Sequence, residues 1–219
     1  MLRLAPDSRN RLLDAALKVI RTKGYSATRV DDICAVAGLS KGSFFHHFES
    51  KEALAVAAAE YWSQITGSLF EAAKYHSLDD PLARLLAYLD FRRSLVHGDL
   101  PEWTCLVGTM AQETYTTVPE IREACDRSIR GHADTLVADI TAAKKRYAPD
   151  ADWSPKSLAL HTQVVLQGAF VVAKAHGDAR VATDAIDHLR RYFELLFPIP
   201  RTHSKSKSKS KNKRKKKSR

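Results

Sequence analysis

The sequence has few cysteines, and their arrangement suits neither a disulfide framework nor a zinc site. Its three cysteines, Cys34, Cys105 and Cys125, lie far apart, with no Cys-x-x-Cys pair and no His–Cys ligand spacing. An odd, sparse set of cysteines is typical of a protein from a reducing compartment. Cys34 lies between core positions of a short predicted helix, so we expect it to be a small buried thiol.

Long apolar runs and the motifs of enzymes are also missing. No segment approaches the roughly 20 apolar residues that span a bilayer, and the N-terminus has no apolar signal core. There is no nucleophile elbow, phosphate-binding loop or His-Glu-x-x-His motif. The sequence therefore predicts a cytoplasmic protein that has no membrane partner, is not an enzyme, and needs neither a cofactor nor a metal.

Acidic residues are absent from one end of the chain. Residues 201–219 hold eleven Lys or Arg and no acid, so this segment supplies most of the formal net charge of +10. Such a low-complexity segment cannot bury apolar surface, and we expect it to be disordered. It would either add non-specific affinity for DNA or simply keep the protein soluble. Residues 1–51 are also basic, whereas residues 52–200 are mildly acidic, which favours a nucleic-acid-binding N-terminus.

The stretch from residue 28 to residue 51 carries the most specific pattern. Thr28 is expected to cap a short helix, with Asp31 completing an approximate capping box. Gly38 would end that helix, because glycine tolerates a positive φ. Ser40 would then cap a second helix over residues 41–47. Two short helices joined by a tight turn are typical of a helix-turn-helix, whose second helix enters the DNA major groove.

Residues 38–54, GLSKGSFFHHFESKEAL, closely resemble the signature of the TetR family of bacterial transcriptional regulators. The resemblance extends back over the preceding helix, residues 9–24. It implies a dimeric, all-helical, ligand-controlled DNA-binding protein. Residues 105–113 (CLVGTMAQE) and 166–178 (LQGAFVVAKAHGD) also look like stretches of the ligand-binding region in a subgroup of these regulators.

Apolar periodicity predicts an all-α fold without a credible strand. We expect a three-helix helix-turn-helix domain over residues 1–50, a roughly six-helix ligand-binding and dimerisation domain over residues 51–200, and the basic tail over residues 201–219. The nine expected helices cover residues 9–24, 28–37, 41–47, 52–75, 81–97, 101–115, 119–147, 156–176 and 178–197.

Side chains near the start of the second helix are the expected DNA contacts, because that end of a recognition helix reaches base edges and phosphates. The family commonly has Tyr where this chain has Phe45, and Phe can only pack against a sugar or a thymine methyl. A metal site at His46 and His47 is not expected, since neighbouring residues on a helix point about 100° apart. The predicted DNA-binding residues are Thr28, Arg29, Lys41, Gly42, Ser43, Phe45, His46, His47 and Lys51.

The resemblance implies an effector pocket between the middle helices, lined by apolar groups with a few polar ones. Ordinary core packing accounts for each candidate equally well. The candidates are Tyr88, Phe91, Trp103, Val107, Met110, Glu113, Thr114, His161, Gln167 and Phe170. The family also pairs its last two helices with those of a second subunit, although packing within one chain is the alternative. The interface candidates are Val165, Gly168, Val172, Ile186, Leu189, Phe193 and Leu196.

These expectations together predict a homodimeric regulator of double-stranded DNA. We expect a repressor that a small-molecule effector releases from a palindromic operator. The alternative is an effector-independent DNA-organising protein that uses its basic tail for non-specific binding.

Overall fold

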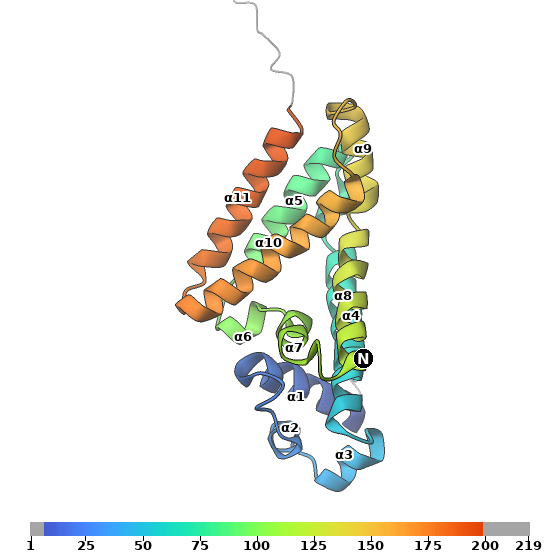
Figure 1. Ribbon diagram of the computed structural model, residues 1–219, viewed down its shortest axis with the longest axis vertical. Helices are drawn as coiled ribbons and strands as arrows, with labels where there is room; N and C mark the ends of the chain where they lie inside the picture. The colour runs from blue at the N-terminus through green and yellow to red at the C-terminus, as the bar shows by residue number, and fades with distance from the viewer. Residues whose placement is uncertain (1–6, 199–219) are drawn as a thin grey trace, which may run out of the picture.

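The computed structural model describes residues 7–198, and the predicted tail over residues 201–219 lies outside them. Among the described residues every regular element is a helix, which confirms the all-α prediction. Three short helices form the N-terminal head at one end of the molecule, and a long helix leads away from it (Figure 1). These helices are α1 (Ser8–Lys23), α2 (Val30–Ala37), α3 (Lys41–His47) and α4 (Lys51–Glu71).

The remaining helices form the body. Helices α4 and α8 run side by side away from the head, while α10 and α11 pair on the other side of the body (Figure 1). The short α6 and α7 lie at the end of the body that contacts α1. A 3-10 turn, η1 (Lys74–Ser77), links α4 to the body, whose helices are α5 (Pro81–Ser94), α6 (Leu100–Trp103), α7 (Leu106–Thr114), α8 (Pro119–Asp134), α9 (Val137–Tyr147), α10 (Pro155–His176) and α11 (Arg180–Leu196).

Two segments expected to be single helices are each divided. The segment over residues 101–115 breaks at Thr104, whose extended backbone separates α6 from α7. The segment over residues 119–147 breaks after Asp134, where the Leu136 amide bonds the Ala133 carbonyl at 3.0 Å in a tighter turn. Leu136 is buried there, so the break turns an apolar side chain into the core. Periodicity missed both breaks, because each half remains helical.

The N-cap of the first helix of the helix-turn-helix lies one residue later than expected. Thr28 is buried, and its hydroxyl donates to the Gly24 carbonyl at 2.6 Å, so it does not cap α2. Arg29 occupies the N-cap position, and its amide donates to the Asp32 carboxylate at 2.7 Å. The prediction of Thr28 as cap with Asp31 as its partner is therefore wrong, because the Thr28 hydroxyl is already used by the preceding turn.

The head and the body share a hydrophobic core. The apolar side chains of α1–α3 pack in one cluster with those of α4, α7 and α8. A second cluster joins α5, α9, α10 and α11 at the far end of the molecule. Packing is therefore continuous across the domain boundary expected at residue 50.

One described helix, α10, is long and apolar enough to cross a membrane by length and composition alone. Its buried side chains include Leu158, Leu166 and Phe170, which belong to the core cluster shared with α11. Packing inside the protein therefore accounts for its apolar character.

Candidate nucleic-acid interface and effector cavity

The turn between α2 and α3 is held by the backbone and by α1. Gly38 has a left-handed φ of 63°, and the Leu39 amide bonds the Cys34 carbonyl at 3.0 Å. The Arg11 guanidinium of α1 donates to the Ala37 carbonyl at 2.6 Å, which satisfies the open C-terminal end of α2. Sequence reasoning missed this role of Arg11, because no local motif links residues so far apart in the chain.

One face of helix α3 is buried against the head core, and the opposite face is exposed to solvent. Phe44 and Phe48 are buried in the head core, whereas Phe45 is 54% exposed. The side chains of Lys41 and His46 are also exposed. The buried pair fixes the rotation of the helix, so Lys41, Phe45 and His46 are presented together at the surface.

The other predicted contacts on α3 lie beside this exposed group. Gly42 is exposed and Ser43 is half-buried. His47 is half-buried as well, and its Nε2 lies 2.6 Å from the Ser8 hydroxyl of α1. On α2 the Arg29 side chain is exposed, and Asp31 forms an ion pair with Lys41 at 2.8 Å. The Asp31 carboxylate is therefore paired with Lys41, the lysine at the start of α3.

Two predicted contacts point inward. The Thr28 side chain is buried, so it cannot reach DNA, and that prediction is wrong. The Lys51 ammonium donates to the carbonyls of Tyr25 and Thr28, both at 3.2 Å, and lies 4.2 Å from the Tyr25 ring centroid. A phosphate contact by Lys51 would compete with these three interactions, whose first role is to join α4 to the α1–α2 turn.

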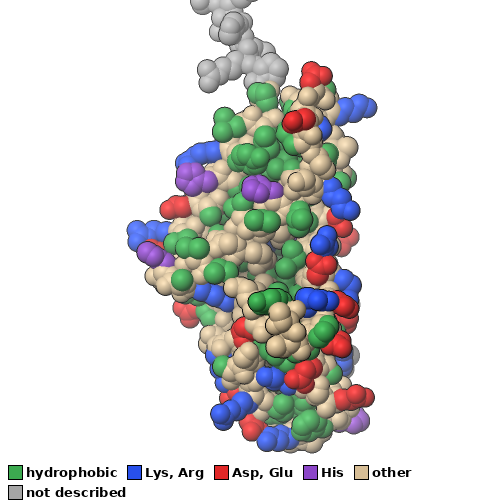
Figure 2. All heavy atoms as spheres, viewed as in Figure 1, with side chains coloured by type: hydrophobic (Ala, Val, Ile, Leu, Met, Phe, Trp, Pro, Cys, Tyr) green, Lys and Arg blue, Asp and Glu red, His purple; other side chains and the backbone are tan. Residues whose placement is uncertain are grey.

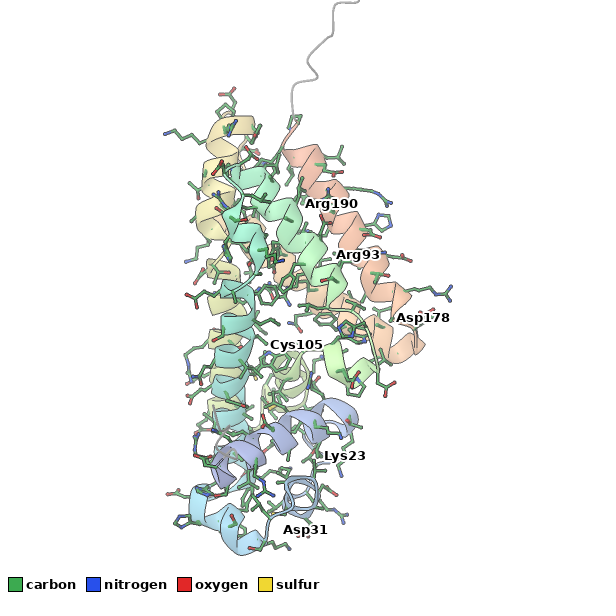
Figure 3. The ribbon with its side chains drawn as sticks, turned by 180° about the vertical axis from the view of Figure 1, so that it is seen from behind. Lys23, Asp31, Arg93, Cys105, Asp178 and Arg190 are labelled. Atoms are coloured by element: carbon green, nitrogen blue, oxygen red, sulfur yellow. The ribbon has the colours of Figure 1, made fainter. Side chains whose placement is uncertain are left out.

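A cavity of about 430 Å³ lies in the body between α4, α5, α8 and α10, and α6 and α7 contribute to its wall. Of the pocket residues predicted from the sequence, Trp103, Val107, Gln167 and Phe170 line it. Gly108 lets the Gln167 amide approach closely, because a Cβ there would lie 2.0 Å from Oε1 of Gln167. Cys105, labelled in Figure 3, also lines the cavity near the junction with the head.

Two aromatic candidates lie behind the cavity wall rather than on it. The Tyr88 hydroxyl bonds Nε2 of His132 at 3.0 Å and accepts from Nε of Arg92, also at 3.0 Å. Phe91 packs against Phe70 with a centroid distance of 5.3 Å. The cavity wall in front of them includes Phe70, Arg92 and His132, which come from three different helices. Sequence reasoning considered Arg92 for an anionic ligand but favoured a surface salt bridge for it, and it missed Phe70 and His132.

The remaining four pocket candidates do not line the cavity. Met110 is fully buried in the head core. The Thr114 hydroxyl donates to the Met110 carbonyl at 2.8 Å, and His161 is exposed and packs on Tyr192 at 5.4 Å. Glu113 points to the head, as described next. None of these four residues therefore lines this cavity: Met110, Glu113 and Thr114 lie on the part of α7 that faces the head, and His161 is exposed on α10.

Glu113 joins the body to the head. Its carboxylate accepts from the amides of Tyr25 at 3.1 Å and Ser26 at 2.7 Å, in the turn that leads into α2. Gly24 has a φ of 87°, and a Cβ there would lie 2.6 Å from the Glu113 carboxylate, so glycine allows this approach. The first turn of α7 thus lines the cavity, and its last turn is hydrogen-bonded to the segment that leads into α2.

Burial sets the charge state of the cavity. Burial and the neighbouring Arg92 lower the pKa of His132 from 6.5 to about 3, so this imidazole is neutral at physiological pH. Among the described residues no cluster of three or more His, Cys, Asp or Glu side chains is placed to hold a metal ion.

The apolar side chains of α10 and α11 are divided between the core and the surface. Ile186, Leu189 and Phe193 are buried within their own chain, so the prediction that they face a second subunit is wrong. Val172 is 53% exposed and Gly168 is exposed with open space at its Cβ, whereas Val165 and Leu196 are half-buried. Figure 2 shows hydrophobic side chains over the face that α10 crosses. The other exposed apolar residues of the two helices are Leu160, Val164, Val171, Tyr192 and Leu195.

An exposed recognition helix on a buried scaffold, joined to a helical body that contains a cavity, defines a helix-turn-helix DNA-binding regulator. Family comparison agrees with this class. The model for bacterial regulatory proteins of the tetR family matches residues 12–58, and the model for the tetracyclin repressor-like C-terminal domain matches residues 81–189. The chain belongs to the TetR family of bacterial DNA-binding transcriptional regulators.

Individual relatives extend over most of the chain. The transcriptional regulator AcuR of Cereibacter sphaeroides is 28% identical over 78% of this chain and 79% of its own. The repressor NemR of Escherichia coli is 24% identical over 84% of this chain and 92% of its own. The uncharacterised regulator YerO of Bacillus subtilis is 38% identical, but the match covers 26% of this chain and only 19% of its own length.

Solved structures share the fold. A regulatory protein TetR from Rhodobacter sphaeroides superposes with a TM-score of 0.74 at 26% identity, and the match covers 87% of this chain and 98% of that one.

Proposed function

We propose that this protein is a homodimeric repressor in the bacterial cytoplasm that leaves a palindromic operator when a small molecule enters the body cavity. The attachment of α7 to the head carries this proposal. Val107 and Cys105 meet the cavity at one end of α7, and Glu113 holds the Tyr25 and Ser26 amides at the other. A ligand that shifts α7 therefore changes the position of the recognition helix. The effector acts by binding the DNA-incompetent state more tightly.

A second subunit would pack on the exposed apolar stripe of α10, which comprises Leu160, Val164, Gly168, Val171 and Val172, with Tyr192 and Leu195 of α11 beside it. The α10 residues recur at helical spacing, so they form one continuous face. Two chains paired there carry two heads, and a palindromic operator offers two half-sites about 34 Å apart or a multiple of that distance. The proposal contains no catalytic step, and the cavity serves binding alone.

The test begins with the DNA upstream of the protein's own gene. We expect saturable binding of the full chain to a palindromic sequence in this DNA, and release on addition of a cavity ligand. Truncation before Arg201 is expected to lower the salt dependence of binding but to keep the sequence preference. Binding that is sequence-independent and survives removal of residues 1–50 would instead support the DNA-organising alternative.

A further inference from the structure

Arg92 brings a positive charge to the cavity wall that no carboxylate of residues 7–198 neutralises. Its Nε donates to the Tyr88 hydroxyl at 3.0 Å, while its two terminal nitrogens have no acceptor within the described part of the chain. The next residue, Arg93, forms an ion pair with Asp187 at 2.9 Å on the outer surface, where Figure 3 labels it. Arg92 is half-buried, and a cation withdrawn from water gains from a bound counter-charge.

The neighbours of Arg92 orient its guanidinium without reducing its charge. The Phe70 ring centroid lies 4.3 Å from Cζ of Arg92, which is cation–π distance. Because the Tyr88 hydroxyl accepts from Arg92, its own proton goes to Nε2 of His132, 3.0 Å away. The imidazole is therefore a neutral acceptor for Tyr88, and Arg92 alone supplies charge at this end of the cavity. A fixed planar guanidinium with two open nitrogens matches the two oxygens of a carboxylate.

An aromatic surface lies on the same cavity wall. Trp103 lines the cavity and is 9% exposed, while its indole nitrogen is buried away from the cavity space. The ring of Trp103 packs against Phe170 at 5.9 Å, which gives this end of the cavity an aromatic surface.

Negative charge is scarce in the cavity lining. Among residues 7–198 the only carboxylate in the lining is that of Glu60, which is exposed and lies 3.9 Å from the Arg127 guanidinium on the facing helix α8. No carboxylate therefore lies beside Arg92 or Trp103 to receive a cationic ligand. The volume of about 430 Å³ is near the lower end of the usual range for ligand pockets, about 300–1,000 Å³. A single-ring or short-chain molecule fits that space.

We infer that the effector is a small organic monoanion, a carboxylate on a flat or short apolar body. The carboxylate binds the two terminal nitrogens of Arg92, and the apolar body packs between Phe70 and the Trp103–Phe170 pair. This inference names the ligand class of the cavity, so its regulatory meaning rests on the proposed function, whereas ligand binding itself does not.

Matched ligands test the charge preference directly. Benzoate, benzamide and benzylamine share one ring, and hexanoate, hexanamide and hexylamine share one chain. Binding is measured on the full-length protein by thermal shift and by tryptophan fluorescence, since Trp62 and Trp103 line the cavity. We expect each carboxylate to bind about tenfold more tightly than its amide and its amine, because the charge-assisted pair with Arg92 is lost in both. Equal binding by amide or amine, or no binding by any of the six, would overturn the inference.

The Arg92→Gln variant tests whether Arg92 is the group that favours carboxylate ligands. We expect it to weaken carboxylate binding about tenfold or more and to leave amide binding unchanged. Arg93→Gln is the matched control and should change neither. Arg92→Lys keeps the charge but loses the planar fork, so it should retain a weaker carboxylate preference, and it provides the same test if the Gln variant does not fold. A loss of less than about threefold in Arg92→Gln, or no preference in Arg92→Lys, contradicts the inference.

Operator release is scored separately in the same samples. A neutral ligand that occupies the cavity and releases DNA would overturn the monoanion while leaving the proposed function in place. Carboxylate binding that depends on Arg92 but never alters operator affinity would support the carboxylate site in the cavity and overturn the proposed function.

Discussion

At the scale of single residues, the ion pair between Lys41 and Asp31 leads to a prediction about DNA binding. Both side chains are well exposed, and the two nearest charged atoms lie 2.8 Å apart. In solvent such a pair contributes little to stability. We expect it to affect binding instead, because Asp31 pairs with Lys41 and places a negative charge next to the position expected for a phosphate.

Asp31→Asn is therefore expected to tighten operator binding several-fold. Lys41 would then neutralise a phosphate without first leaving a carboxylate, so the slope of log affinity against log salt should steepen by about 0.9. Fluorescence anisotropy over a range of salt concentrations measures both quantities. Asp126→Asn is the control, since it removes a similar exposed ion pair, with Arg130 at 2.7 Å, far from the head. Unchanged affinity and slope would show that Lys41 does not contact phosphate.

His132 predicts how stability depends on pH. Its pKa in the folded protein is lowered to about 3, by burial and then by Arg92, so the unfolded chain binds the proton more readily. The folded state keeps its full stability above about pH 6.5 and loses it as the pH falls from there toward 3. Across that window His132 contributes a slope of at most about 1.4 kcal/mol per pH unit.

Replacing His132 by Gln, which still offers the Tyr88 hydroxyl an acceptor, should remove this contribution. Urea unfolding at a series of pH values is expected to give a shallower fall in the free energy of unfolding between pH 6.5 and 4 than in the wild type. His161→Gln changes an exposed histidine and should leave the wild-type slope. Parallel curves for wild type and His132→Gln would mean that the imidazole is charged in the folded state.

At the scale of elements, we expect α7 to transmit ligand binding to the DNA-binding head. Glu113→Gln keeps the shape of the side chain but removes the negative charge that holds the Tyr25 and Ser26 amides. We expect this variant to bind the operator and to bind the cavity ligand, yet to show a smaller change in operator affinity when the ligand is added. The reason is that the coupling free energy is transmitted through contacts that differ between the two states.

The measurement is the ratio of operator dissociation constants with and without saturating ligand. Gln112→Ala, at the preceding exposed position of α7, is the control. If the ratio is the same in Glu113→Gln as in the wild type, the signal reaches the head by another route, such as the shared core of α1, α4 and α8.

At the scale of the whole molecule, we expect the exposed stripe of α10 to form the interface between two subunits. Val164 is 61% exposed in the single chain, and an aspartate there would place a charge at the centre of the proposed interface. Val164→Asp is expected to be monomeric and to lose about a hundredfold or more in operator affinity, because the second half-site is no longer held in place by the first.

Light scattering coupled to size exclusion, followed by operator titration, measures both effects. Leu78→Asp is the control, since Leu78 is also an exposed apolar residue, 39% exposed, but lies outside α10 and α11. A dimeric Val164→Asp protein with wild-type operator affinity would place the interface elsewhere.

The sequence by itself determined the class of fold, the helix-turn-helix and the family, because these depend on patterns within a few turns of helix. Ser40 caps α3 and Gly38 ends α2, both as predicted from local rules. The exposure of Lys41, Phe45 and His46 likewise follows from the buried spacing of Phe44 and Phe48.

Only the tertiary structure decided which side chains meet. Thr28 and Lys51 turned out to bind the α1–α2 turn, Glu113 to hold the head, and Ile186, Leu189 and Phe193 to pack within their own chain. Arg92, His132 and Phe70 come together from three helices to form one end of the cavity. Periodicity marks the face of a helix that is buried but not the partner that buries it, because that partner lies far away in the chain.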